Sequence, residues 1–310
     1  MSGPVDERAL GWVNDGQMGI QVRQGRSTSV GGLEVVRVLP TKGRRTIGGW
    51  CFVDLMLPPD VDHPDPMEIG PHPHIGLSTV TWLFSGEALH GDSLGTEQVI
   101  RPGQLNLMTA GRGIAHSEMS CAAGVHGAQM WIAQPESTRH GESSFEHHAE
   151  LPRLEFENGQ ATVLVGSYGG VTSPARADSP LVGMEITLEG GVTELSVEPS
   201  FEYGVVPIDR PVKLNEDIVE TGWLGLIEQA PESIRIEAAA AGTRLMFLGG
   251  EPLGEKIEMW WNFVARSKDE LTDAWRAWQN HDTDLFGPVP SKLARIEAPP
   301  PPWTIEAQSG

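Results

Sequence analysis

The stretch that decides how this chain folds reads GPHPHIG and spans residues 70–76. Side chains alternate between the two faces of an extended chain, so His72 and His74 point to the same side. Pro73 lies between them and stiffens the backbone. Two imidazoles on one face of a strand are suited to bind a single metal ion, so the stretch predicts a strand that carries two metal ligands.

A second pair with the same spacing lies further along the chain. His116 and Glu118 follow the sequence GRG at residues 111–113. Together the two pairs offer three imidazoles and one carboxylate, a ligand set that suits a divalent first-row metal and leaves a net positive centre. A lone His-x-His pair is often a chance occurrence in a loop, whereas two matched pairs in a β-rich chain favour a metal site.

Short runs of β-branched and aromatic residues surround both motifs. Residues 35–39, 50–57 and 78–84 form such runs, and each ends at a proline or a Ser-Gly pair. The same pattern continues from residue 161 to residue 248. Strands this short, at even spacing and without a long helix between them, predict antiparallel β sandwiches or barrels.

Composition divides the chain into two halves. Its 310 residues suggest about two domains, and 37 Gly with 24 Pro exclude a helical bundle. Nine of the ten histidines lie between His63 and His148, so the halves differ in chemistry. We therefore predict a metal-binding N-terminal β domain, a linker, a C-terminal β domain without metal and a Pro-rich tail. Their predicted bounds are 1–133, 134–150, 151–290 and 291–310.

One helix is predicted near the end of the second half. Ser267 and Glu270 fit a capping box. Leu271, Ala274 and Trp278 follow at helical spacing on one face. The spacing predicts a short helix over residues 268–279 whose tryptophans pack on a sheet.

Charge and cysteine content exclude several classes of protein. The chain has 22 Lys and Arg against 42 Asp and Glu, a net charge of −20, which disfavours direct binding to nucleic acid. Its 2 cysteines cannot build a disulfide framework. No apolar run reaches the roughly 18 residues that a membrane span needs. We expect a cytoplasmic monomer that does not bind membranes.

The motifs together resemble the pirin family of the cupin superfamily. The most specific part of the resemblance is MTAGRGIAHSE at residues 108–118, joined by residues 70–76 and by GEALHGDSLG at 86–95. The resemblance implies a bicupin, an all-β fold of two facing antiparallel β-barrels of jelly-roll type, with one metal, usually iron, in the N-terminal barrel. The family's four ligands correspond to four residues that this chain retains. They are His72, His74, His116 and Glu118.

Two classes of function follow from this resemblance. One is a dioxygenase of the quercetin 2,3-dioxygenase type, which uses Fe(II) and O₂ to open a flavonol such as quercetin, with Glu118 as both ligand and general base. The other is a metal-dependent regulatory or interaction protein without catalytic turnover. Its acidic second half would then bind a basic protein partner.

The expected pocket wall departs from the family pattern. Family members carry Arg-Gly-Phe-Glu after the His-x-His pair, where this chain has Ile-Gly-Leu-Ser at residues 75–78. Ser78 shares the parity of His72 and His74, so we expect it near the metal. We expect Leu107, Phe52 and Trp131 to complete the substrate pocket. The sequence favours plain hydrogen-bonding roles for the histidines outside the ligand set, among them His90, His126, His147 and His148.

Overall fold

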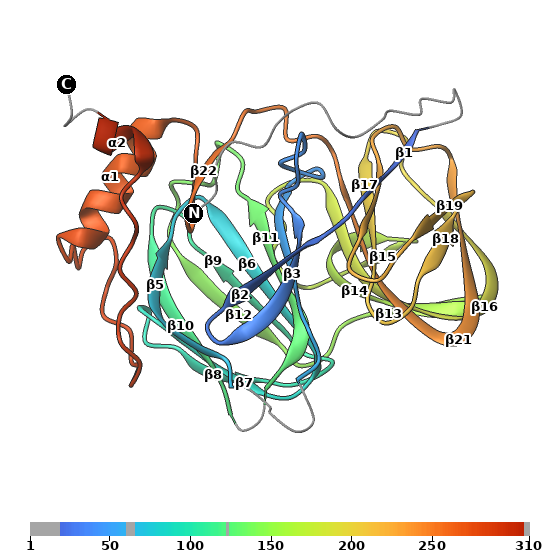
Figure 1. The fold of residues 1–310 in the computed structure, drawn as a ribbon, viewed down its shortest axis with the longest axis horizontal. Helices are drawn as coiled ribbons and strands as arrows, with labels where there is room; N and C mark the ends of the chain where they lie inside the picture. The colour runs from blue at the N-terminus through green and yellow to red at the C-terminus, as the bar shows by residue number, and fades with distance from the viewer. Residues whose placement is uncertain (1–18, 60–65, 122–123, 307–310) are drawn as a thin grey trace.

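The computed structural model describes residues 19–59, 66–121 and 124–306. Two β units lie side by side, and a pair of short helices lies at the far side of the first unit (Figure 1). The predicted all-β class, with two antiparallel units and a short C-terminal helix, is confirmed. The ends of the predicted first domain and of the predicted tail, residues 1–18 and 307–310, lie outside the described residues.

The first unit is built from two antiparallel sheets. A seven-stranded sheet runs in the order β12-β9-β6-β11-β4-β3-β2, and a four-stranded sheet runs in the order β5-β10-β7-β8. Their bounds are β2 (Arg26–Val30), β3 (Leu33–Leu39), β4 (Trp50–Met56), β5 (Glu68–His74), β6 (Leu77–Ser85), β7 (Ala88–Asp92), β8 (Glu97–Ile100), β9 (Leu105–Thr109), β10 (Ile114–Ser120), β11 (His126–Ala133) and β12 (Ser144–His148). Because neighbouring strands are antiparallel, side chains of paired residues share a face and one face of each sheet points inward.

The second unit is one ten-stranded sheet that includes two long strands, β16 and β21. Its bounds are β1 (Ile20–Arg23), β13 (Arg153–Phe156), β14 (Gly159–Tyr168), β15 (Val171–Thr172), β16 (Leu181–Ser196), β17 (Glu202–Pro207), β18 (Val212–Leu214), β19 (Asp217–Val219), β20 (Leu224–Ile227) and β21 (Ser233–Gly250). Buried side chains, Tyr203 and Phe247 among them, fill its interior. The second unit thus packs a solid core.

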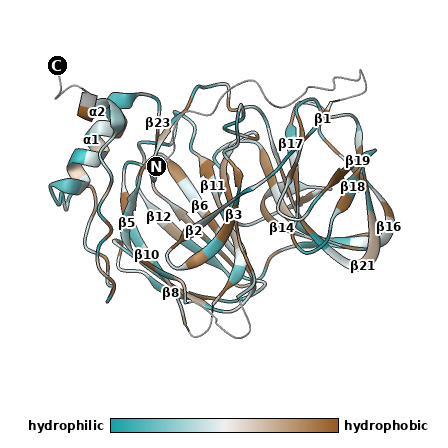
Figure 2. Cartoon of the chain, viewed as in Figure 1, coloured by the Kyte–Doolittle hydropathy of each residue, from teal (hydrophilic) through white to brown (hydrophobic). Residues whose placement is uncertain are grey.

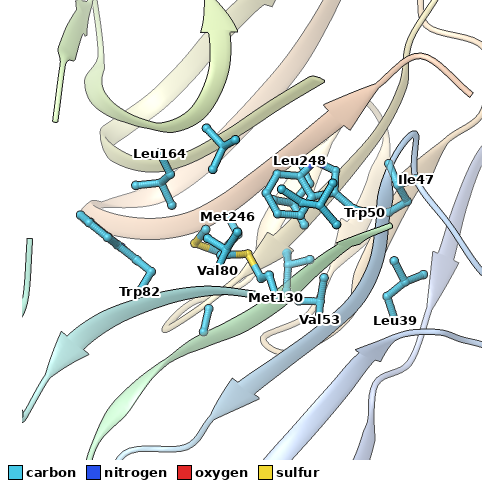
Figure 3. Packing of buried hydrophobic residues seen from close by; sticks show 14 of the residues in the cluster. Leu39, Ile47, Trp50, Val53, Val80, Trp82, Met130, Leu164, Met246 and Leu248 are labelled. Carbon is cyan, nitrogen blue, oxygen red and sulfur yellow. The ribbon is translucent and has the colours of Figure 1, made fainter. Parts of the chain in front are cut away.

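A hydrophobic core joins the two units. Val80 and Met130 from the first unit meet Leu164 and Met246 from the second (Figure 3). Brown, hydrophobic stretches mark the strands that meet there, including β11 and β14 (Figure 2). The indole Nε1 of Trp50 donates across the boundary to the carbonyl oxygens of Val182 and Gly249, at 3.1 and 3.2 Å. Because complete burial of one such side chain is worth roughly 1.5–3 kcal/mol, this core binds the two units together.

The N-terminal strand does not belong to the unit that follows it. β1 pairs with β20 of the second unit, with Ile20 opposite Ile227. The predicted first domain is therefore wrong at its start, because residues 20–23 complete the second sheet. An unpaired edge strand leaves backbone groups without partners, and β1 covers that edge of β20.

The C-terminal segment packs on the first unit. This segment comprises β22 (Glu258–Trp260), β23 (Phe263–Ala265), α1 (Lys268–Gln279) and α2 (Pro302–Glu306). It shares a buried cluster with Ala115 of β10, and Figure 1 shows α1 and α2 beside β5. The predicted helix over residues 268–279 is confirmed, with Ser267 Oγ accepting from the backbone N–H of Glu270 at 3.2 Å. The helix follows the second unit in the sequence, but its buried residues Leu271, Ala274 and Trp278 pack in a cluster with Ala115 of the first unit.

The predicted linker and tail are also more ordered than the sequence suggests. β12, inside the predicted linker, pairs with β9 and so extends the seven-stranded sheet. In the tail, α2 begins at Pro302, a position where the missing N–H of proline costs nothing. Indole N–H groups of Trp275 and Trp278 donate to the carbonyls of Ala298 and Ile296 at 3.2 and 2.9 Å. The tail is thereby fixed to α1.

Within the described part of the chain, no helix combines the length and the apolar character that crossing a membrane requires.

Candidate metal centre

Two neighbouring strands carry the four predicted ligands. His72 and His74 end β5, and His116 and Glu118 lie on β10, with His116 directly opposite His72. The register shifts between His116 and Glu118, and such a bulge re-aims the side chains next to it. All four residues are buried.

The side chains converge inside the first barrel. Ring centroids of His72 and His116 are 4.3 Å apart, and those of His74 and His116 are 4.9 Å apart. Ligand atoms of the three imidazoles all lie within 4.8 Å of one another. Glu118 forms a second group of this kind with His116 and His90. His116 belongs to both groups, and all four predicted ligands line one cavity.

Hydrogen bonds fix the orientation of two of the imidazoles. Nδ1 of His72 lies 2.9 Å from the carbonyl oxygen of Gly70, and Nδ1 of His74 lies 3.0 Å from that of Asn262. A carbonyl oxygen only accepts, so in both rings Nδ1 carries the proton and Nε2 presents a lone pair. This is the arrangement in which histidine binds a metal.

Burial changes the pKa values of all four predicted ligands in a way that favours a bound cation. It lowers the pKa of His72 to about 4 and those of His74 and His116 well below the ordinary histidine value, so all three rings are neutral. Burial also raises the pKa of Glu118, although His90 and the hydrogen bond from Thr81 act to lower it. Neutral nitrogen ligands around a buried carboxylate suit a divalent metal ion, which would compensate the carboxylate charge. The residues therefore fit a metal centre.

A cavity of about 310 Å³ opens onto this centre. Phe52 and Trp131 form part of its wall and stack with centroids 4.0 Å apart. Trp131 also meets the edge of His74, at 5.2 Å. The guanidinium of Arg37 lies over the Phe52 ring at 4.5 Å and holds Asp54 through two hydrogen bonds of 2.8 and 2.7 Å. Apolar side chains form much of the remaining lining, namely those of Val30, Leu33, Val35, Met56, Met67, Ile69 and Ile296.

Ser78 and Leu107 do not line this cavity, so that part of the pocket prediction is wrong. Ser78 donates to Thr109 Oγ1 at 3.1 Å, and Leu107 belongs to the core between the two units. The parity of His72 and His74 is lost at Gly76, whose φ of +67° turns the chain between β5 and β6. After the turn, Thr81 faces the metal centre in place of Ser78, and its hydroxyl lies 3.3 Å from Glu118 Oε1.

The sequence analysis missed residues that come from the C-terminal segment. Trp261 and Asn262 line the cavity, as does Ile296 of the tail. Trp261 has a φ of +53°, a strained conformation for a bulky residue, and such strain gathers at functional sites. The only available signal was the unusual sequence Trp-Trp-Asn at residues 260–262, which is equally typical of a packed core.

His90 was also undervalued. The sequence favoured a plain hydrogen-bonding role, and His90 does lie 3.0 Å from Asp92 Oδ2. Its other ring nitrogen lies 3.4 Å from Nδ1 of His116, directly behind the metal centre. The spacing of His90 and Asp92 places both on one face of β7, and this was the signal that could have identified them.

Known proteins share this fold and sequence over most of the chain. Residues 32–132 match the model of the Pirin family, and residues 183–284 match that of the Pirin C-terminal cupin domain. A Pseudomonas aeruginosa protein named "Putative quercetin 2,3-dioxygenase PA1205" is 42% identical over 90% of this chain and 89% of its own length. A pirin-like protein from Caulobacter vibrioides is 36% identical over 86% of this chain and 97% of its own.

A solved structure agrees with these matches. A crystal structure of quercetin 2,3-dioxygenase from Acinetobacter baumannii has a TM-score of 0.86 and 40% identity to this chain. The match covers 91% of this chain and 96% of the other. With two cupin units and three histidines and a glutamate at one buried centre, the chain belongs to the pirin family of bicupin proteins.

Proposed function

We propose that this protein is an Fe(II)-dependent dioxygenase that opens the ring of a flavonol such as quercetin with O₂. The observation that carries the proposal is the placement of three imidazoles and one carboxylate at a cavity with an aromatic wall. Two similar proteins also bear the name quercetin 2,3-dioxygenase. Bound iron would supply a positive charge that acidifies a substrate hydroxyl beside a carbonyl, together with redox chemistry for O₂.

Glu118 is the residue to which we assign the proton transfer. Its Oε1 lies 3.3 Å from the hydroxyl of Thr81, which also lies 2.9 Å from Gln129 Oε1. Thr81 thereby orients one carboxylate oxygen. We assign the other oxygen to the metal and to the proton of the substrate hydroxyl, which makes Glu118 both ligand and general base.

The cavity wall provides the remaining requirements of such a reaction. Its volume falls within the range of roughly 300–1,000 Å³ that is typical of sites for small molecules. The apolar wall excludes water from a reactive substrate anion. Arg37, Asp54 and Gln129 place hydrogen-bonding groups in the same cavity, where they can meet the hydroxyl groups of a polyphenol.

An oxygen electrode tests the proposal directly. Protein reconstituted with Fe(II) should consume O₂ when quercetin or another flavonol is added, and His74→Ala, treated identically, should not. If the iron-loaded protein consumes no O₂ with any member of a flavonol panel, the dioxygenase proposal fails. A metal-dependent interaction protein then becomes the better interpretation.

A further inference from the structure

A histidine and an aspartate lie directly behind the metal centre. On β7, Asp92 is the cross-strand partner of His116, and His90 is that of Glu118. His90 Nε2 lies 3.0 Å from Asp92 Oδ2, and His90 Nδ1 lies 3.4 Å from His116 Nδ1. His90, Asp92 and His116 are 4%, 0% and 1% exposed, so these contacts are sealed from solvent. The positions of the protons on His90, Asp92 and His116 are therefore set by the hydrogen bonds among these residues and not by water.

Asp92 fixes one end of this chain of contacts. Its Oδ1 accepts the backbone N–H groups of Leu94 and Thr96, at 2.9 and 3.0 Å. Burial raises the pKa of Asp92, but the hydrogen bonds from His90, Thr96 and Leu94 outweigh it and hold the pKa below the ordinary aspartate value. An ionised carboxylate only accepts, so the proton between Asp92 and His90 is carried by His90 Nε2.

The position of this proton determines the next one. The proton on Nε2 leaves Nδ1 of His90 to act as acceptor, so the 3.4 Å contact between the two Nδ1 atoms is completed by a proton on Nδ1 of His116. His116 Nε2 is then unprotonated and lies 3.0 Å from His74 Nε2. That atom is unprotonated too, because His74 Nδ1 donates to the carbonyl of Asn262. Two lone pairs at this distance repel each other and attract a shared cation.

We propose that His90 is a positioning residue of the metal centre, and that Asp92 acts through it to hold His116 in the tautomer that binds metal. His72 and His74 obtain the same tautomer from backbone carbonyls, which no side-chain substitution removes. His116 depends on side chains alone. The stack of His90 on Phe145, at 4.4 Å, keeps the ring in the required plane.

Asp92→Asn is the sharpest test because it preserves the shape of the side chain and exchanges donor and acceptor in the hydrogen bonds from residue 92 through His90 to His116. The backbone N–H groups of Leu94 and Thr96 need an acceptor, so the amide oxygen replaces Oδ1 and the amide NH₂ faces His90. His90 then carries its proton on Nδ1, and His116 is forced to carry one on Nε2, where the metal binds. We expect the Kd of the apoprotein for Co(II), measured by chelator competition without substrate, to rise ten- to a hundredfold. An unchanged Kd would overturn the proposal.

His90→Phe distinguishes positioning from a structural role. Phenylalanine keeps the stack on Phe145 and removes both nitrogens, so His116 can adopt either tautomer. We expect a smaller loss of Co(II) affinity than in Asp92→Asn. The double variant should bind Co(II) as His90→Phe does, since the misplaced donor is gone. Additive losses in the double variant would show a structural role and refute the proposal.

Two further comparisons complete the experiment. Asp178→Asn makes the same chemical change at a carboxylate that also accepts from side chains but has no contact with a ligand, and it should leave the Kd unchanged. His74→Ala sets the level of complete metal loss. If His90→Phe reaches that level, His90 is itself a ligand and the positioning role is wrong. Because Co(II) affinity is measured without substrate, the result stands even if the protein turns over no flavonol.

Discussion

Glu118 combines two roles at the residue scale, and glutamine separates them. An amide oxygen still offers a weak ligand, whereas an amide cannot accept a proton from the substrate. We expect Glu118→Gln to lower the flavonol-dependent rate of O₂ uptake at least about tenfold, a loss of roughly 1.4 kcal/mol in barrier lowering. The rate is to be compared at equal iron content. A metal-loaded variant that turns over as fast as the parent would exclude Glu118 as the base.

His74 tests the metal centre itself. It is 1% exposed, and its Nδ1 donates to the carbonyl oxygen of Asn262, which leaves Nε2 to bind the metal. Elemental analysis should show the metal content of purified His74→Ala fall from near one per chain to near zero. His126→Ala is a matched control, because His126 lies on β11 against Phe84, away from the ligands. Unchanged stoichiometry in His74→Ala would contradict the site.

The ligands could be predicted from sequence because their spacing is a local property. His72 with His74, and His116 with Glu118, share a strand face whatever the rest of the chain does. Ser78 could not be placed in this way, because the turn at Gly76 breaks the parity between β5 and β6. The sequence also could not predict that Asn262 and Ile296 line the cavity, because this depends on the packing of segments that are far apart in the sequence.

At the scale of elements, the tail should act as part of the first barrel. Deleting residues 291–310 removes the acceptors of the Trp275 and Trp278 indoles and the Arg295 guanidinium that lies 3.5 Å over Trp278. It also removes Ile296 from the cavity wall. We expect a lower unfolding midpoint in urea and a red-shifted tryptophan fluorescence. Deleting residues 307–310 alone is the control, and an identical response of both deletions would contradict a packing role.

Local sequence pattern predicts some of the helices and strands but not how all of the strands pair. The helix at residues 268–279 was predictable because its cap and its apolar face lie within twelve consecutive residues. The pairing of Ile20 with Ile227 was not, because a short strand such as β1 carries no signal for its partner. Edge pairing is decided by which backbone groups remain free once the rest of the sheet has formed.

At the scale of the whole molecule, the shared core should make unfolding cooperative. Met130 is fully buried between the units, so Met130→Ala leaves a cavity and should cost about 2–5 kcal/mol of unfolding free energy. Calorimetry should still show one transition, shifted to lower temperature. Two separate transitions, only one of them shifted, would show that the units unfold independently.

Asp178 should make this stability depend on pH. Burial raises the pKa of Asp178, but hydrogen bonds from Arg176, Thr138 and Gln134 outweigh this effect. The folded pKa therefore lies below the ordinary aspartate value. The resulting stability is fully present above the unfolded pKa of about 3.9 and is lost as the pH falls through the folded pKa. In urea, Asp178→Asn should be less stable than the parent at pH 7, and the difference should shrink as the pH falls below about 4. A constant difference across this range would contradict the prediction.

β1 completes the second unit and the C-terminal segment packs on the first, and this arrangement has a consequence for how the protein is synthesised. β1 leaves the ribosome well before its partner strand, because Ile20 pairs with Ile227. The hydrogen bond from His74 likewise forms only once Asn262 has been synthesised. The second sheet is therefore completed only after β20 has emerged, and the metal centre of the first unit only after Asn262 has emerged. Metal loading that precedes the emergence of the last residues would meet a site with an open wall, so insertion of the ion into this protein is expected to follow synthesis rather than accompany it.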